Sequence, residues 1–131
     1  MADPKTFVSE YIRAIQAGAT GDALACFFTD DVVQEEFPNR LMPAGATRNL
    51  AAILEGAERG QLVMRKQEFQ IHNVVSSGST IVVELTWLGT LAIAIGALTP
   101  GDQMRARFCI VLELKDGRIQ RQRNYDCFDA F

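Results

Sequence analysis

Histidine is nearly absent from this sequence, which has 131 residues and a single histidine, His72. A multi-histidine metal site is therefore excluded, and any Ser-His-Asp or Cys-His machinery would have to use that one residue. The three cysteines, Cys26, Cys109 and Cys127, cannot all pair with one another and include no Cys-x-x-Cys spacing. We interpret them as reduced thiols in the core and expect neither a metal site nor a cofactor.

Long apolar runs and a strong net charge are also missing. The longest uncharged apolar run, at positions 91–98, is far shorter than the roughly 20 residues that a membrane-spanning helix needs. Thirteen basic and 16 acidic residues give a net charge of −3, which is too weak to collect polyanions. The first residues, MADPKTF, lack the apolar core of a secretory signal. We therefore expect no membrane segment, no nucleic-acid partner and a cytoplasmic location.

The sequence does have the composition of an ordinary globular chain, with 48% apolar and 22% charged residues. Because a domain has about 150 residues, we expect a single domain over residues 1–131. Apolar residues recur with the helical period up to residue 60 and with the strand period of two from residue 61 onward. Helices are expected near residues 4–17, 22–28 and 48–58, and strands near residues 32–37, 62–76, 79–97, 103–115 and 118–128. The predicted fold is α+β, with three N-terminal helices packed into a strongly curved, mainly antiparallel sheet.

Alternation along the strands assigns side chains to the two faces of this sheet. Trp87 lies on the apolar face of its strand, and Phe108 and Ile110 lie on the apolar face of the next. These three side chains are expected to point inward. The opposite, outer face carries three scattered apolar residues among charges: Val82, Leu88 and Val111.

The last strand is the exception, because both of its faces are polar. One face carries Gln122, Asn124 and Asp126, and the other carries Arg121 and Arg123. Turning the arginines inward would bury unpaired charges, so the first set is expected inside. Two amides and a carboxylate between apolar walls are typical of a ligand pocket. A polar network satisfied within the protein would give the same pattern.

Asp126 is the candidate proton-transfer group of this pocket. Burial raises the pKa of a carboxyl because the charged form loses hydration, and a raised pKa suits acid–base chemistry near neutrality. Gln122 and Asn124 are the expected hydrogen-bond partners of Asp126. The alternatives are that Asp126 is a polar wall of the pocket or a structural hydrogen-bond acceptor.

Several short segments carry a resemblance to a known family. The chain resembles the nuclear transport factor 2-like superfamily, and within it the SnoaL-like branch that includes ketosteroid isomerases, polyketide cyclases and limonene epoxide hydrolases. The matching segments are YIRAI at 11–15, GDAL at 21–24, FTDD at 28–31, EFP at 36–38, GRI at 117–119 and RNYD at 123–126. The resemblance implies a cone-shaped fold around a pocket for a small apolar or partly polar ligand, and a homodimer.

The resemblance also implies roles for individual residues. Tyr11 matches the tyrosine that supplies an oxyanion donor in ketosteroid isomerases. Glu36 matches their general base when the downstream glycine anchors the comparison, whereas Phe37 takes that place when the proline does. Asn124 stands where polyketide cyclases keep an acid–base aspartate, and Asp126 lies two residues later on the same face. The resemblance thus leaves Asp126 as the candidate for that role.

Three functions agree with these observations. The first is an acid–base enzyme, of isomerase, cyclase or hydrolase type, that acts on a small, mostly apolar substrate. The second is a binding module with the same pocket and no turnover, and the third is an interaction module that uses the outer sheet face. The candidate catalytic residues are Asp126, Glu36 and Tyr11. The candidate pocket-lining residues are Trp87, Phe108, Ile110, Gln122 and Asn124.

Overall fold

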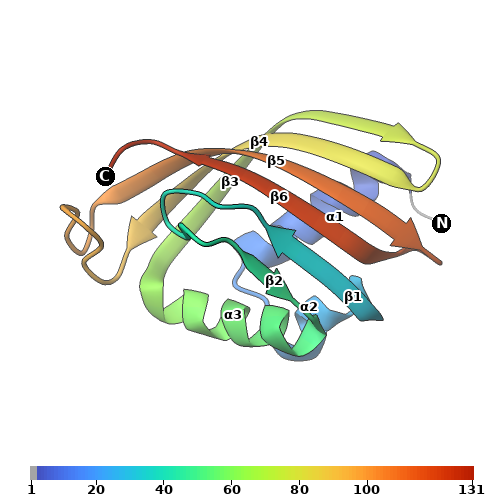
Figure 1. Cartoon of the computed structure of the whole chain (residues 1–131), viewed down its shortest axis with the longest axis horizontal. Coiled ribbons are helices and arrows are strands. Elements are labelled where there is room, and N and C mark those ends of the chain that lie inside the picture. The colour runs from blue at the N-terminus through green and yellow to red at the C-terminus, as the bar shows by residue number, and fades with distance from the viewer. Residues whose placement is uncertain (1–2) are drawn as a thin grey trace.

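A computed structural model describes residues 3–131 of the chain (Figure 1). Helix α1 (Pro4–Gln16) begins after Asp3, whose carboxylate accepts hydrogen bonds from the backbone of the first turn. Helix α2 (Gly21–Ala25) has five residues, and helix α3 (Leu50–Val63) begins after Asn49. The strands are β1 (Phe28–Glu36), β2 (Ala46–Arg48), β3 (Met64–Ser77), β4 (Thr80–Leu91), β5 (Gln103–Lys115) and β6 (Arg118–Phe128).

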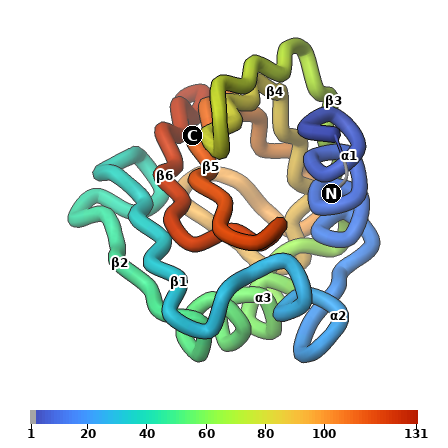
Figure 2. Tube along the Cα trace, turned by 90° about the vertical axis from the view of Figure 1, so that its right-hand side faces the viewer, coloured from blue at the N-terminus to red at the C-terminus, as the bar shows by residue number. Residues whose placement is uncertain are grey.

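The strands of residues 3–131 form one six-stranded sheet in the order β2-β1-β6-β5-β4-β3. Strands β3 to β6 follow one another as an antiparallel meander, whereas β1 runs parallel to β6. Figures 1 and 2 show the sheet curving around an interior that α1 and α3 also border. The fold is thus α+β with a mixed sheet, and the parallel pair brings the end of β1 beside the middle of β6.

The helices differ from the prediction in length. Helix α2 ends at Ala25 and not at residue 28, because Phe28 already begins β1. Helix α3 was predicted to end at residue 58 but continues through Gly60 to Val63. A glycine inside a helix costs only about 1 kcal/mol, so it does not stop a helix that packing supports. Arg48, predicted as the first residue of this helix, belongs to β2.

Strand β4 is also shorter than predicted. It ends at Leu91, where the backbone amide and carbonyl pair with Asp102 and Gly101. The next amide, of Ala92, donates to the carbonyl of Val63, so the chain leaves the sheet there. Ile93, which follows in that loop, is 44% exposed. The apolar run that continues beyond Leu91 therefore belongs to a loop.

The two faces of β6 lie as the alternation predicts. Gln122 is 3% exposed on the inner side, whereas Arg121 is exposed on the outer side. Arg123 donates to the carboxylate of Glu113 on the neighbouring strand β5. The arginines are therefore paired or solvated outside the core, and the polar set of β6 faces the interior. No helix within residues 3–131 is both long enough and apolar enough to span a bilayer.

Candidate functional site

A cavity of about 520 Å³ lies between α1, α3 and the inner face of the sheet. This volume falls within the range of roughly 300–1,000 Å³ that is usual for small-molecule sites. Most of its wall is apolar, and α3 contributes the largest share. The polar side chains that line it are Tyr11, Gln34, Glu36, Arg48, Arg59, Gln67, Asn124 and Asp126.

Most of the sequence-predicted site residues lie at this cavity. Those that line it are Tyr11, Glu36, Trp87, Phe108, Asn124 and Asp126. Ile110 and Gln122, also predicted to line the pocket, are not part of its wall. Ile110 is 6% exposed and packs in the hydrophobic core, and Gln122 lies behind the wall in a hydrogen-bonded network. Both residues point inward as predicted, but other side chains separate them from the cavity.

Asp126 is the least satisfied polar group of the site. Among the residues that the structure describes, its Oδ1 atom is buried and has no hydrogen-bond partner. The pKa of Asp126 is raised from 3.8 to about 7. Burial is the largest cause, the nearby charge of Glu36 adds to the rise, and Arg48 opposes both. The predicted partners Gln122 and Asn124 bond to each other and not to this carboxyl. Buried polar atoms without a partner are rare in native proteins, so this atom is the first candidate for a functional role in the cavity.

Glu36 and Arg48 form an ion pair beside Asp126. Their Oε1 and Nη2 atoms are 2.9 Å apart, and the two side chains are only 12% and 20% exposed. The second oxygen of Glu36 accepts from Nδ2 of Asn39 at 2.8 Å. Arg48 also donates to Oε1 of Gln34 at 3.2 Å. Both oxygens of Glu36 are therefore engaged by the protein itself.

The structure also shows which of two neighbouring residues points into the cavity. Glu36 lines it, whereas Phe37 stacks on Tyr125 with ring centroids 4.7 Å apart. Tyr125 is 45% exposed and lies on the outer face of β6. The comparison that anchors on the downstream glycine is therefore the one that matches the geometry.

A chain of hydrogen bonds connects α1 with the polar face of β6. The hydroxyl of Tyr11 donates to Oε1 of Gln122 at 2.9 Å, and Nε2 of Gln122 donates to Oδ1 of Asn124 at 2.9 Å. Burial raises the pKa of Tyr11 above its ordinary value of 10, so the phenol keeps its proton. The amide orientation of Asn124 follows from this chain, because its oxygen is already used.

Three aromatic rings form the wall next to Asp126. Trp87 and Phe108 stack with centroids 5.7 Å apart and planes at 17°. Phe128 meets both edge to face, at 5.7 and 5.9 Å. The indole Nε1 of Trp87 donates to Oε1 of Gln67 at 2.9 Å. The rings are packed against one another, and each contributes to the cavity wall.

Sequence reasoning missed five polar residues of the site: Gln34, Asn39, Arg48, Arg59 and Gln67. Arg48 was assigned to a helix, because a three-residue strand such as β2 carries almost no periodic signal. Gln34 and Arg48 meet because β1 and β2 pair in a register that puts them opposite each other. The position of Gln67 opposite Gly89 depends in the same way on the pairing of β3 with β4. These contacts can be predicted only when the register of each strand pair is known.

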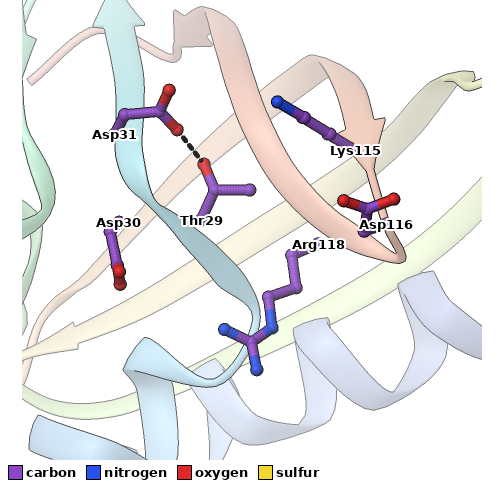
Figure 3. A pocket seen from close by; sticks show the side chains of 6 residues that line it. All are labelled: Thr29, Asp30, Asp31, Lys115, Asp116 and Arg118. Carbon is purple, nitrogen blue, oxygen red and sulfur yellow. Dashed lines mark hydrogen bonds between the residues drawn. The ribbon is translucent and has the colours of Figure 1, made fainter.

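A second pocket lies on the surface, at the start of β1 and the turn between β5 and β6 (Figure 3). Its lining residues are Thr29, Asp30, Asp31, Lys115, Asp116 and Arg118. Hydrogen bonds from Thr29 and Gln120 hold the pKa of Asp31 below its ordinary value. Within residues 3–131 no three metal-ligating side chains come together. This pocket has charges of both signs and no buried polar group, so we interpret it as a solvated turn.

Comparisons with known proteins agree with the fold. IdmH from Streptomyces antibioticus, provisionally assigned as a polyketide cyclase, has a TM-score of 0.77 at 18% identity, with 95% of this chain and 92% of IdmH covered. AclR from Streptomyces galilaeus, provisionally assigned as a hydroxylase, has a TM-score of 0.77 at 13% identity, with 96% and 79% covered. An NTF2-like protein of unknown function from Burkholderia pseudomallei has a TM-score of 0.76 at 18% identity, with 98% and 92% covered.

These identities are low enough that the solved structures show the shared fold alone. No curated protein matches this sequence. The model of the SnoaL-like domain family matches residues 8–122, which is most of the chain. The chain therefore belongs to the SnoaL-like domain family.

Proposed function

We propose that the protein is an acid–base enzyme that acts on a small, mostly apolar molecule with a carbonyl group, and that Asp126 transfers the proton. The observation that carries this proposal is the buried, unpartnered Oδ1 atom of Asp126 at a cavity of ligand size. A carboxyl with a pKa of about 7 accepts and returns protons with similar ease at neutral pH. The apolar wall favours a substrate that is apolar over most of its surface.

Asn124 is the proposed hydrogen-bond donor to the carbonyl oxygen. Its own oxygen accepts from Gln122, and within residues 3–131 its Nδ2 group donates to no other group. Asn124 lines the cavity two residues before Asp126 on the same face of β6. A ligand carbonyl placed against this amide would bring the adjacent carbon toward the carboxylate of Asp126.

The proposed step is proton abstraction next to the carbonyl. The carboxylate of Asp126 takes the proton, and the electron pair of the broken C–H bond moves onto the carbonyl oxygen as an enolate. Asn124 stabilises that negative charge by its hydrogen bond, as oxyanion-hole donors do. Where the enolate is conjugated with a carbon–carbon double bond, Asp126 can return the proton at the far carbon, which is an isomerisation. Alternatively, the enolate carbon attacks a second carbonyl, which closes a ring, and Asp126 returns its proton to the new alkoxide oxygen.

The roles of Glu36 and Tyr11 in this proposal are indirect. Both oxygens of Glu36 are engaged by Arg48 and Asn39, so Glu36 acts through its charge, which keeps the pKa of Asp126 high. Tyr11 already donates its proton to Gln122, so Tyr11 orients Asn124 through Gln122. Each of them is a positioning residue for Asp126 and Asn124, the two residues that contact the substrate.

A second candidate is a ligand-binding module without turnover. The contacts of Glu36 and Tyr11 favour this candidate. Both are predicted catalytic residues, and their polar groups already bond to other residues of the protein. In that case Asp126 would hold a hydroxyl or amine of the ligand. The two candidates differ in whether the removal of the titrating group changes a rate.

The variant Asp126→Asn separates the two candidates. We expect it to lower turnover by about 10²-fold or more, because the amide keeps the shape but cannot shuttle a proton. Apolar carbonyl compounds and epoxides are screened with the wild-type chain, and the turnover and affinity of any substrate found are then measured for both chains. Affinity should change by only a few fold, and Asp30→Asn, at an exposed acid outside the cavity, serves as the control. Undiminished turnover in Asp126→Asn would favour the binding module.

We also propose a homodimer built on the outer face of the sheet. Val82, Leu88 and Val111 are partly buried there, and both signs of charge occur around them, for example in the Arg123–Glu113 pair. A face with both signs can pair with a second copy of itself across a two-fold axis. A stable contact should bury roughly 800 Å² per chain.

Light scattering at micromolar concentration should give twice the mass of one chain. Val111→Glu should give the mass of one chain, because it places an unpaired charge at the centre of the contact. A wild-type mass equal to that of one chain would refute the dimer.

A further inference from the structure

Gly89 lies near the end of β4, on the same inner face as Trp87, which lines the cavity. It is buried, and its φ is outside the left-handed region, so the backbone conformation does not require glycine. Glycine inside a strand weakens the strand and often marks a place where another group approaches closely. The reason for this glycine must therefore be the space that a side chain would fill.

That space is taken by the indole of Trp87. A Cβ atom at position 89 would lie 2.4 Å from Cζ2 and 2.5 Å from Cη2 of Trp87, and 2.9 Å from Sδ of Met64. All three distances are shorter than real Cβ contacts. The methionine is flexible, but the indole is a rigid plane whose far ring covers the glycine. Gly89 therefore allows the indole to lie flat against the sheet.

The rest of the surroundings hold the indole in that orientation. Gln67 lies directly opposite Gly89 on β3 and accepts the hydrogen bond of Trp87 Nε1 at 2.9 Å. Phe108 stacks on the indole and Phe128 meets its edge, so neither side offers room for a shift. The indole can therefore move only toward the cavity. A methyl group at position 89 would thus turn the indole away from Gln67 and into the cavity.

We propose that Gly89 is a specificity-determining residue: by keeping Trp87 flat against β4, it leaves the part of the cavity next to the indole free for the ligand. This inference rests on the proposed function, because it assumes that the cavity receives the ligand. It adds the residue that limits how large a ligand the cavity accepts beside Asp126 and Asn124. The indole is only 4% exposed and is packed against Phe108, so it acts as a wall of the cavity.

The test uses 2-acetylnaphthalene, which joins a flat ring system to a carbonyl, in a double-mutant cycle. The four chains are the wild type, Gly89→Ala, Trp87→Phe and the variant with both changes. A phenyl ring lacks the two indole atoms that the new methyl group would meet, so Trp87→Phe removes the conflict. Binding is measured through the fluorescence of the probe, and thermal unfolding shows that each chain is folded.

We expect Gly89→Ala to weaken probe binding at least 10-fold when Trp87 is present and by less than about 2-fold when phenylalanine replaces it. Trp87 is the single tryptophan of the chain, so its emission reports directly on the move. That emission should shift to longer wavelength in Gly89→Ala, because the indole leaves its packed site and turns into the more polar cavity. Gly60→Ala is the matched control for the emission, because its new methyl group also lies at the cavity wall but meets nothing within 4 Å.

Three results would overturn the inference: unchanged emission and affinity in Gly89→Ala, an equal loss of affinity with Trp87 and with Phe at position 87, or no binding of the probe to the wild-type chain. None of them decides whether Asp126 transfers a proton. That proposal fails separately, if Asp126→Asn turns over a substrate from the screen as fast as the wild type does.

Discussion

Replacing Asp126 by asparagine should reduce the fall in the free energy of unfolding that we expect as the pH rises toward 7 and Asp126 ionises. The folded carboxyl has a pKa of about 7, whereas an unfolded one has its ordinary value of 3.8. Between these two values the folded chain binds more protons than the unfolded chain, so the free energy of unfolding falls as the pH rises. Above pH 7 both states are ionised and the loss is complete. In the variant no group at position 126 titrates.

The size of this effect follows from the difference between the two pKa values. At pH 8 the burial of ionised Asp126 costs the wild-type chain roughly 3 kcal/mol relative to pH 4, which corresponds to about 10 °C in melting temperature. The melting temperatures of the wild type, Asp126→Asn and the control Asp30→Asn are measured from pH 4 to pH 8. The curve of Asp126→Asn should lie above that of the wild type at pH 8 and approach it at pH 4. Parallel curves would mean that Asp126 titrates normally and that the proton-transfer proposal has lost its basis.

The position of Asp126 could be predicted from the sequence because the argument needed only a strand period of two and the cost of burying arginines. The burial of Gln122 and the exposure of Arg121 confirm that assignment. The absence of a partner for Asp126 could not be predicted. It depends on which of three neighbouring polar groups pair, and Gln122 is drawn to Tyr11 on a helix more than 100 residues away in the sequence.

The ion pair at the polar end of the cavity marks a second limit of sequence reasoning. Glu36 was a candidate, but Arg48 was assigned to a helix, and nothing in the local pattern connected the two. Their contact arises from the β1–β2 register and from the turn between those strands. In that turn Asn39 bonds to Glu36 and to the backbone of Leu41 and Met42. A contact that depends on the register of two strands can be predicted only when their pairing is known. The face of the sheet on which a side chain lies can be predicted from one strand alone.

The Glu36–Arg48 pair leads to the second prediction with a large effect, which concerns Arg48→Met. Methionine keeps an unbranched apolar stem but removes the charge, so the carboxylate of Glu36 is left nearly buried without its partner. Removing one member of a buried ion pair typically costs about 3–5 kcal/mol. Gln34 also loses its hydrogen-bond donor. We expect the free energy of unfolding to fall by roughly 3 kcal/mol at pH 7.

The same variant should change the titration of Asp126. Arg48 lowers the pKa of Asp126, so its removal should raise that pKa above 7. The measurement is the ¹³C shift of the Asp126 carboxyl against pH, which needs no ligand.

The chain with both Glu36→Gln and Arg48→Met provides the control for this prediction. It has no unpaired charge at the site, so most of the lost stability should return, as is usual when both members of a buried pair are replaced. The raising effect of Glu36 on Asp126 is also gone, but burial, the largest cause, remains. The pKa of Asp126 should therefore stay well above 3.8 in this chain and lie below its value in Arg48→Met. An Asp126 carboxyl that titrates identically in all three chains would show that the ion pair does not act on it. Asn124 and the cavity wall would then be left as the groups that determine its chemistry.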